Sequence, residues 1–266
     1  MFTTPFAFMA AAPALWTPAD ITTFYWIDSS DSATITLSGS NVSQWDDKSG
    51  NGFNATQATD AFRPGLTGAL NGLNIVYWDG TKKMDLPNMA WGSKNISYYS
   101  VTNNTGGLTA PYRFSVNLVM KKAGTDSIAA LSNTVTGGKF IWYTGTGADL
   151  NYSGTNSQTP QIQTTFSVVS QTGNASTNTA EYWWNGDSRG NNVGGWNGTS
   201  GPFSNAFLGN DEYGSSTFGN IAEIVIVNQV DSTAERERME GYLAWKWGLE
   251  ANLPINHPYY NAPPFV

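Results

Sequence analysis

Short apolar runs separated by Asn-Gly pairs are the feature that most constrains the fold of this chain. The clearest run is Tyr112 to Lys121, where apolar and polar residues alternate with a period of two. That period is typical of an antiparallel strand with one buried face. Similar short runs recur at Phe24–Ile27, Asn74–Trp78, Phe140–Tyr143, Thr165–Val169, Glu181–Trp184 and Ala206–Leu208. The pattern therefore predicts many short strands.

Two further signals specify how these strands are arranged. Asn-Gly pairs at 51–52, 71–72, 185–186 and 197–198 favour tight hairpin turns, because both residues tolerate positive φ. The run Ile221 to Val227 is almost entirely apolar and rich in β-branched residues, which predicts a central strand buried on both faces. Since no helices alternate with the strands, the sequence predicts an all-β antiparallel sandwich or jelly roll.

One helix is expected, over residues 232–248. Ser232 can cap its N-terminus, and Glu235 three residues later completes a capping box. Gly248 occupies the position of a C-terminal cap. The apolar residues Met239, Tyr242, Leu243 and Trp247 follow helical spacing. This stripe is expected to pack against the edge of the sandwich and close it.

A set of motifs spans residues 16–262. Its members are Trp16–Asp20 with Trp26–Asp31, Val42–Gly52, Tyr77–Thr81, Gly219–Ile224, Gly241–Leu249 and His257–Tyr259. Together they resemble the laminin-G-like, concanavalin A-like jelly rolls of bacteriophage structural proteins. The resemblance implies a concanavalin A-like sandwich and a place in a virus particle. It implies function only loosely, because the same fold serves lectins, glycanases and inert shells.

The first fifteen residues differ from the rest of the chain. Residues 1–15 are mostly apolar, with Phe2, Phe6, Phe8, Met9 and Leu15 as their largest side chains. The absence of a basic residue before Lys48 and the interruptions at Pro5 and Pro13 argue against a signal peptide. The run is too short to span a bilayer. We expect an arm that docks on a partner or on its own body, followed by a single domain over 16–266.

Charge and cysteine content exclude several classes of partner and chemistry. Only 12% of residues are charged, the net charge is −7, and lysines and arginines do not cluster, so nucleic acid is not expected as a partner. The chain has no cysteine, which excludes disulfides and thiolate chemistry. Aromatic residues make up 14% of the chain, enough for a sizeable core.

Catalytic patterns are missing from the sequence. Glycoside hydrolysis needs two carboxylates at a fixed separation, and in glucanases of this fold they alternate along one strand face. Glu223 is flanked at those offsets by Ile221 and Val225. The single histidine, His257, lies in a proline-rich tail and is interpreted as a packing or capping residue. We therefore expect no enzymatic activity.

Calcium is the one cofactor considered. Asp46, Asp47 and Asp79 could supply oxygen ligands, together with Asn51. Lys82-Lys83 directly after the Asp79 turn would oppose a divalent ion. Asx turns, in which these side chains bond their own backbone, are the favoured interpretation. No cofactor is expected, and calcium remains the alternative.

Aromatic side chains could bind a glycan by stacking on sugar rings. The candidates are Trp142, Tyr143, Trp183, Trp184 and Trp196, with Asn185 and Asp187 as hydrogen-bonding neighbours. Because Trp183 and Trp184 are adjacent on a strand, they must point to opposite faces of the sheet. Packing in the core or in an interface is the favoured role of these residues, and glycan contact is the alternative.

Two functional hypotheses follow. The first is a non-enzymatic structural protein on the surface of a phage particle, assembled in the host cytoplasm: a capsid decoration (cement) protein, or a tail or fibre component. Its partners would be other virion proteins and its own copies, and trimers would suit a capsid lattice. The second is a carbohydrate-binding adhesin that attaches to cell-surface glycans. Neither hypothesis involves nucleic acid or a membrane.

Overall fold

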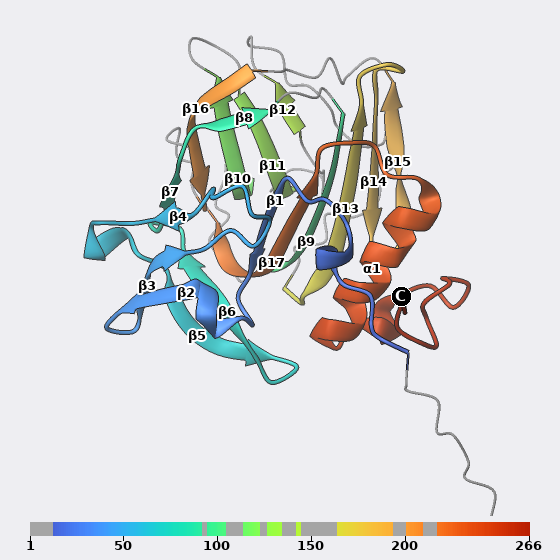
Figure 1. The fold of residues 1–266 in the computed structure, drawn as a ribbon, viewed down its shortest axis with the longest axis horizontal. Coiled ribbons are helices and arrows are strands. Elements are labelled where there is room, and N and C mark those ends of the chain that lie inside the picture. Colours follow the sequence, from blue (N-terminus) through green and yellow to red (C-terminus); the bar gives the residue numbers. More distant parts are fainter. Residues whose placement is uncertain are drawn as a thin grey trace, which may run out of the picture.

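In the computed structural model, antiparallel β-structure makes up most of the described chain, which comprises residues 13–91, 95–104, 114–122, 127–134, 142–144, 164–193, 201–209 and 217–266. A single α-helix, α1 (Thr233–Trp247), occurs in these ranges (Figure 1). The predicted all-β sandwich with one C-terminal helix is therefore confirmed. Short 3₁₀ turns at Pro18–Asp20, Ser32–Thr34, Asp60–Phe62 and Glu250–Asn252 complete the secondary structure of this part of the chain.

The first sheet lies against the helix, and we call it the helix-side sheet. Its strands run in the order β1 (Tyr25–Asp28), β17 (Phe218–Val227), β9 (Ile96–Asn104), β13 (Ser167–Asn174), β14 (Thr179–Trp184) and β15 (Asp187–Val193). The hairpin of β5 (Gly65–Leu70) and β6 (Leu73–Asp79) joins it where β6 pairs with the start of β17. Helix α1 lies over β9 and β13 (Figure 1).

The second sheet packs against the face of the helix-side sheet that is turned away from α1. Its strands are β7 (Met84–Leu86) and β8 (Met89–Trp91), followed by β16 (Gly201–Leu208), β10 (Phe114–Lys122), β11 (Ser127–Thr134) and β12 (Trp142–Thr144). Three short strands bridge the two sheets: β2 (Ile35–Ser38), β3 (Asn41–Trp45) and β4 (Ala55–Thr56). In this bridge β3 pairs with β5, and β4 pairs with β7.

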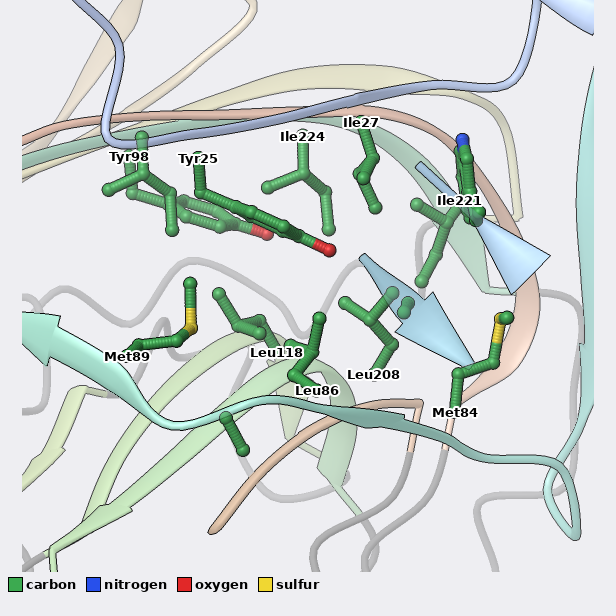
Figure 2. Close-up of a cluster of buried hydrophobic side chains, with 14 of the residues drawn as sticks. Tyr25, Ile27, Met84, Leu86, Met89, Tyr98, Leu118, Leu208, Ile221 and Ile224 are labelled. Atoms are coloured by element: carbon green, nitrogen blue, oxygen red, sulfur yellow. The ribbon is translucent and has the colours of Figure 1, made fainter. Parts of the chain in front are cut away.

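Two buried clusters hold the three layers together. The first lies between the sheets, where Figure 2 shows Tyr25, Ile27 and Ile224 facing Leu86, Met89 and Leu118. The second lies between the helix-side sheet and α1 and includes Tyr99, Val225, Leu243 and Trp247. The helix therefore covers the face of the sheet opposite the second sheet.

Strand β17 contributes to both clusters. Ile224 and Ile226 point into the inter-sheet core, while Val225 and Val227 point toward the helix. All residues from Ile221 to Val227 are buried. The prediction of a central strand buried on both faces is confirmed, and β-branched side chains suit it because they pack well on a pleated surface.

The predicted caps of the helix are confirmed. Ser232 is the N-cap, and its hydroxyl oxygen accepts from the Glu235 backbone N–H (3.3 Å) while its own N–H donates to Glu235 Oε2 (2.7 Å). Gly248 ends the helix in the left-handed region at φ +69°. A glycine is favoured at this position because a side chain there would be strained.

The Asn-Gly predictions were confirmed only in part. Asn71-Gly72 and Asn185-Gly186 each have positive φ at both residues and connect the hairpins β5–β6 and β14–β15. The prediction of a tight turn at Asn51-Gly52 was wrong, because only Gly52 has positive φ and the pair belongs to the longer loop between β3 and β4. Asn197-Gly198 lies outside the described residues.

The predicted strands are present, with shifted ends. The run at Tyr112 becomes β10, which begins at Phe114, and its pairing with β11 is irregular on either side of Val116. The run Thr165–Val169 becomes β13, which extends to Asn174. Strand β9, which lies between β17 and β13, is not among the predicted strands.

Candidate functional site

A group of buried and half-buried polar and aromatic side chains lies between strands β1 and β17 and the C-terminal half of α1. Its members are Trp26, Asp28, Lys48, Glu223, Tyr242, Lys246 and Trp247, and we call it the Glu223 cluster. Asp28 and Glu223 are direct partners in the register of β1 with β17, so their side chains leave the same face of the sheet. The helix then covers both carboxylates.

Glu223 is completely buried and accepts hydrogen bonds from four groups. Its Oε1 accepts from Trp26 Nε1 (2.8 Å) and the Tyr242 hydroxyl (3.0 Å). Its Oε2 accepts from Lys246 Nζ (2.8 Å) and Trp247 Nε1 (2.7 Å). Burial raises the pKa of this carboxyl, and the charge of Lys246 opposes that shift.

Asp28 lies between two lysines. Its Oδ2 is 2.8 Å from Lys246 Nζ and 3.0 Å from Lys48 Nζ. Its Oδ1 accepts from the backbone N–H (3.0 Å) and the hydroxyl (2.6 Å) of Ser30. Burial alone would raise the pKa of Asp28, but Lys246, Ser30 and Lys48 together lower it below its ordinary value.

The Glu223 cluster is not apparent from acids that alternate along a single strand. Asp28 is contributed by a neighbouring strand that is distant in sequence from Glu223. The two acids do not form an open catalytic pair, because both are buried beneath α1 with Lys246 between them. The motifs around Trp26 and Lys246 contained a signal: Lys246 lies between Trp245 and Trp247, and Asp28 follows Trp26 by two residues, on the same face of the strand.

The two adjacent tryptophans of β14 point to opposite faces of the sheet, as predicted. Trp183 lies on the helix side, where the Arg236 guanidinium is 4.3 Å from its ring centroid. Trp184 packs against the inter-sheet core, and Arg189 lies 5.3 Å from its ring centroid. Both side chains are half-buried. Each ring thus already has an arginine near it.

The other glycan-binding candidates are dispersed. Asn185 forms the β14–β15 turn, and its Oδ1 accepts from the Val168 N–H (2.8 Å), while Asp187 is exposed at the start of β15. Trp142 and Tyr143 belong to β12 of the second sheet. Trp196 lies outside the described residues. Among the candidates whose side chains the structure describes, Trp183, Trp184, Asn185 and Asp187 lie together at one hairpin.

The calcium candidates bond to groups of the protein itself. Asp47 accepts from four donors: the N–H groups of Trp26 (3.0 Å), Ser49 (2.9 Å) and Phe53 (3.1 Å), and the Ser49 hydroxyl (2.7 Å). Asp46 accepts from the Gln44 amide (2.6 Å). Asp79 accepts from the N–H (2.9 Å) and hydroxyl (2.7 Å) of Thr81 and lies 3.5 Å from Lys82 Nζ. Asn51 donates to the carbonyl of Phe24 (2.9 Å).

Across the described ranges, no group of three or more acidic or histidine side chains is arranged to hold a metal ion. The same part of the chain also contains no helix that is long and apolar enough to cross a membrane.

His257 is buried at the C-terminal tail. Its Nε2 lies 3.3 Å from Glu240 Oε2, and its Nδ1 accepts from the Tyr259 N–H (3.2 Å). Arg236 also binds Glu240, and its guanidinium stacks on Trp183. The histidine thus anchors the tail to the helix, next to the β14–β15 hairpin.

The two ends of the described chain meet in a short antiparallel ribbon. Leu15 bridges Phe265, with hydrogen bonds from the Trp16 N–H to the Pro264 carbonyl (3.0 Å) and from the Val266 N–H to the Ala14 carbonyl (2.9 Å). Leu15, Phe265 and Val266 are 58%, 43% and 76% exposed. We call these three side chains the terminal patch. Phe2, Phe6, Phe8 and Met9 lie outside the described residues.

Comparison with known proteins identifies relatives by structure and not by sequence. No family model matches the chain, and no curated protein matches it. Among solved structures, it is similar to domain 4 of AbnA, an extracellular arabinanase from Geobacillus stearothermophilus, in complex with arabinotriose (TM-score 0.55, 14% identity, 71% of this chain and 89% of that one).

Two further structures are similar over more of this chain. One is the binding domain of Paraclostridial Mosquitocidal Protein 1 (TM-score 0.53, 11% identity, 83% of this chain and 52% of that one). The other is an arabinofuranosidase complexed with arabinofuranosyl-α-1,2-xylobiose (TM-score 0.55, 15% identity, 82% of this chain and 58% of that one). The chain spans little more than half the length of these two. At such identities the similarity establishes the fold: an antiparallel β-sandwich of a type found in carbohydrate-handling proteins.

Proposed function

We propose that this protein is a non-enzymatic structural component on the surface of a virus particle, a capsid decoration protein or a tail or fibre component. The observation that carries the proposal is the terminal patch, where Leu15, Phe265 and Val266 expose apolar surface at the place where the apolar arm joins the body. Leu15 and Phe265 are direct partners in the terminal ribbon, and exposed apolar side chains that lie together suit a protein contact site. The resemblance to phage jelly rolls supports the viral setting.

The charged clusters are compatible with a structural role. The carboxylates of Asp28, Asp47 and Glu223 each accept several hydrogen bonds from the fold, and Glu240 binds Arg236 and His257. These carboxylates are therefore used to connect parts of the fold, which is the role that a structural protein requires of them. In this proposal, copies of the chain associate with one another and with other virion proteins after synthesis in the host cytoplasm, without metal or cofactor.

The arm and the patch can be tested separately. Removing residues 1–12 retains Ala14 and Trp16, whose hydrogen bonds form the terminal ribbon. The assay adds the variant to particles that lack the protein. We expect the deletion to reduce incorporation tenfold or more, which corresponds to a loss of binding free energy on the order of 1.4 kcal/mol. The melting temperature of the variant should be unchanged. Phe265→Ser should likewise reduce incorporation.

The matched control is Leu37→Ser on β2, since Leu37 is 45% exposed and Phe265 is 43% exposed. It should leave incorporation unchanged. Normal occupancy of particles by both the deletion and Phe265→Ser would contradict the docking role of the arm and the patch.

Carbohydrate binding is the second candidate, and it is favoured by the similarity to the AbnA domain solved with arabinotriose. The β14–β15 hairpin provides the aromatic side chains. Trp184→Ala should abolish binding on a glycan array that includes arabino-oligosaccharides, because stacking on a sugar ring needs the indole. Trp184→Phe, which keeps an aromatic ring at the same position, is the control and should retain part of the binding, and the melting temperatures of both variants report general destabilisation. Absence of any bound glycan with wild-type protein would rule this candidate out.

A further inference from the structure

Within the Glu223 cluster, a lysine and two carboxylates are in mutual hydrogen-bonding contact. Lys246 Nζ lies 2.8 Å from Asp28 Oδ2 and 2.8 Å from Glu223 Oε2. We propose that the side chains of Lys246 and Asp28 condense to an amide, with Glu223 as the base, so that a covalent cross-link joins strand β1 to helix α1. This modification is independent of the proposed function.

The groups around Asp28 match the demands of acyl substitution. The nucleophile is the Lys246 amine once it has lost a proton, and the carbon attacked is Asp28 Cγ. The negative charge that develops on Oδ1 is stabilised by the Ser30 N–H (3.0 Å) and hydroxyl (2.6 Å), which act as an oxyanion hole. Lys48 Nζ, 3.0 Å from Oδ2, holds the oxygen that departs.

The reaction balances within the cluster. In the freshly folded chain Lys246 carries three ammonium protons and Asp28 is a carboxylate. One proton remains on the amide nitrogen, one passes directly to Oδ2, and the third reaches Oδ2 after being held by Glu223. The bond from Nζ to Cγ forms, the bond from Cγ to Oδ2 breaks, and one water leaves. No oxidant, reductant or further reactant is needed.

Burial favours the neutral product over the ion pair. Asp28 and Glu223 are buried, and the rings of Tyr242 and Trp247 lie 5.4 Å and 5.2 Å from Lys246 Nζ. Keeping two charges in such surroundings carries a large desolvation penalty. An amide carries no charge. The bond forms through the minority state in which the proton has moved from Lys246 to Asp28.

A cross-link at this place would stabilise the whole chain. It would close the long loop from Asp28 to Lys246 and thereby restrict the unfolded state, as a disulfide that closes a long loop does. The chain has no cysteine and cannot form disulfides. An amide would provide the same restriction and would be insensitive to reduction.

The test is the intact mass of the purified full-length protein in denaturant. We expect the mass of the sequence minus one water, and a linked peptide pair containing Asp28 and Lys246 after proteolysis. A protein with the full sequence mass, or a link to Lys48 in place of Lys246, would overturn the proposal. The wild-type measurement decides the matter even where a variant fails to fold.

Variants assign the roles. Lys246→Arg retains the positive charge but cannot condense, so it should show the full mass. Lys83→Arg is the matched control, since Lys83 pairs with Asp85 outside the Glu223 cluster, and this variant should still lose water. Glu223→Gln removes the base and should slow cross-linking at least tenfold. Complete cross-linking of that variant at the wild-type rate would exclude Glu223 as the base.

Discussion

At the scale of single residues, Asp231 shows how burial changes an acid. It lies in the connection between β17 and α1, where its Oδ2 accepts from the Tyr99 hydroxyl (2.7 Å) and its Oδ1 from the Gln229 amide (3.0 Å). Its own N–H donates to the Ser97 hydroxyl (2.8 Å). Burial raises the pKa of Asp231 above its ordinary value of 3.8, even though these hydrogen bonds act in the opposite direction.

The raised pKa determines in which direction the stability of the protein changes with pH. A raised pKa means that the folded state binds the proton more tightly than the unfolded state does. The contribution of Asp231 to stability is therefore fully present below pH 3.8 and is lost as the pH rises through the folded-state pKa. Asp231→Asn cannot ionise, so the variant should gain stability relative to wild type as the pH rises above 3.8.

Urea unfolding of both proteins across this range measures the difference. Asp187→Asn, at an exposed aspartate, is the control and should follow the wild-type profile. A constant difference between Asp231→Asn and wild type at every pH would show that the carboxyl does not titrate differently in the folded state.

At the scale of elements, the helix was predicted from the sequence more accurately than the strands were. Helix α1 was predicted to within one residue at each end, with both caps correct, because Ser232, Glu235 and Gly248 are local signals that work without tertiary contacts. Strand β17 was predicted because apolar β-branched residues suit a two-faced strand. Strand β9 was missed, since it is rich in Ser, Thr and Asn. Several of these polar residues are nevertheless buried, because β9 lies between two other strands.

The candidate site was predictable to a similar extent. The opposite orientations of Trp183 and Trp184 follow from the period of a strand. The arginine beside each ring could not be predicted, because Arg236 is contributed by α1 and reaches Trp183 only in the folded chain. The Glu223 cluster was missed for the same reason: β1, β17 and α1 bring its members together.

At the scale of the whole molecule, β17 couples the three layers. Ile224 belongs to the core between the sheets, and Val225 belongs to the core beneath the helix. Because neighbouring residues of one strand hold both cores, the described layers should not unfold separately. We predict a single unfolding transition seen alike by tryptophan fluorescence and far-ultraviolet circular dichroism.

Two substitutions on opposite faces of β17 test this coupling. Ile224→Ala should lower the unfolding free energy by about 3 kcal/mol, and Val225→Ala by about 2 kcal/mol, because each leaves a cavity in a packed core. Both should shift the same transition in both signals. Ile255→Ala, at a side chain that is 82% exposed, should change the free energy by less than about 0.5 kcal/mol. If Val225→Ala instead produced an early transition in which only helical signal is lost, the helix layer would be an independent unit.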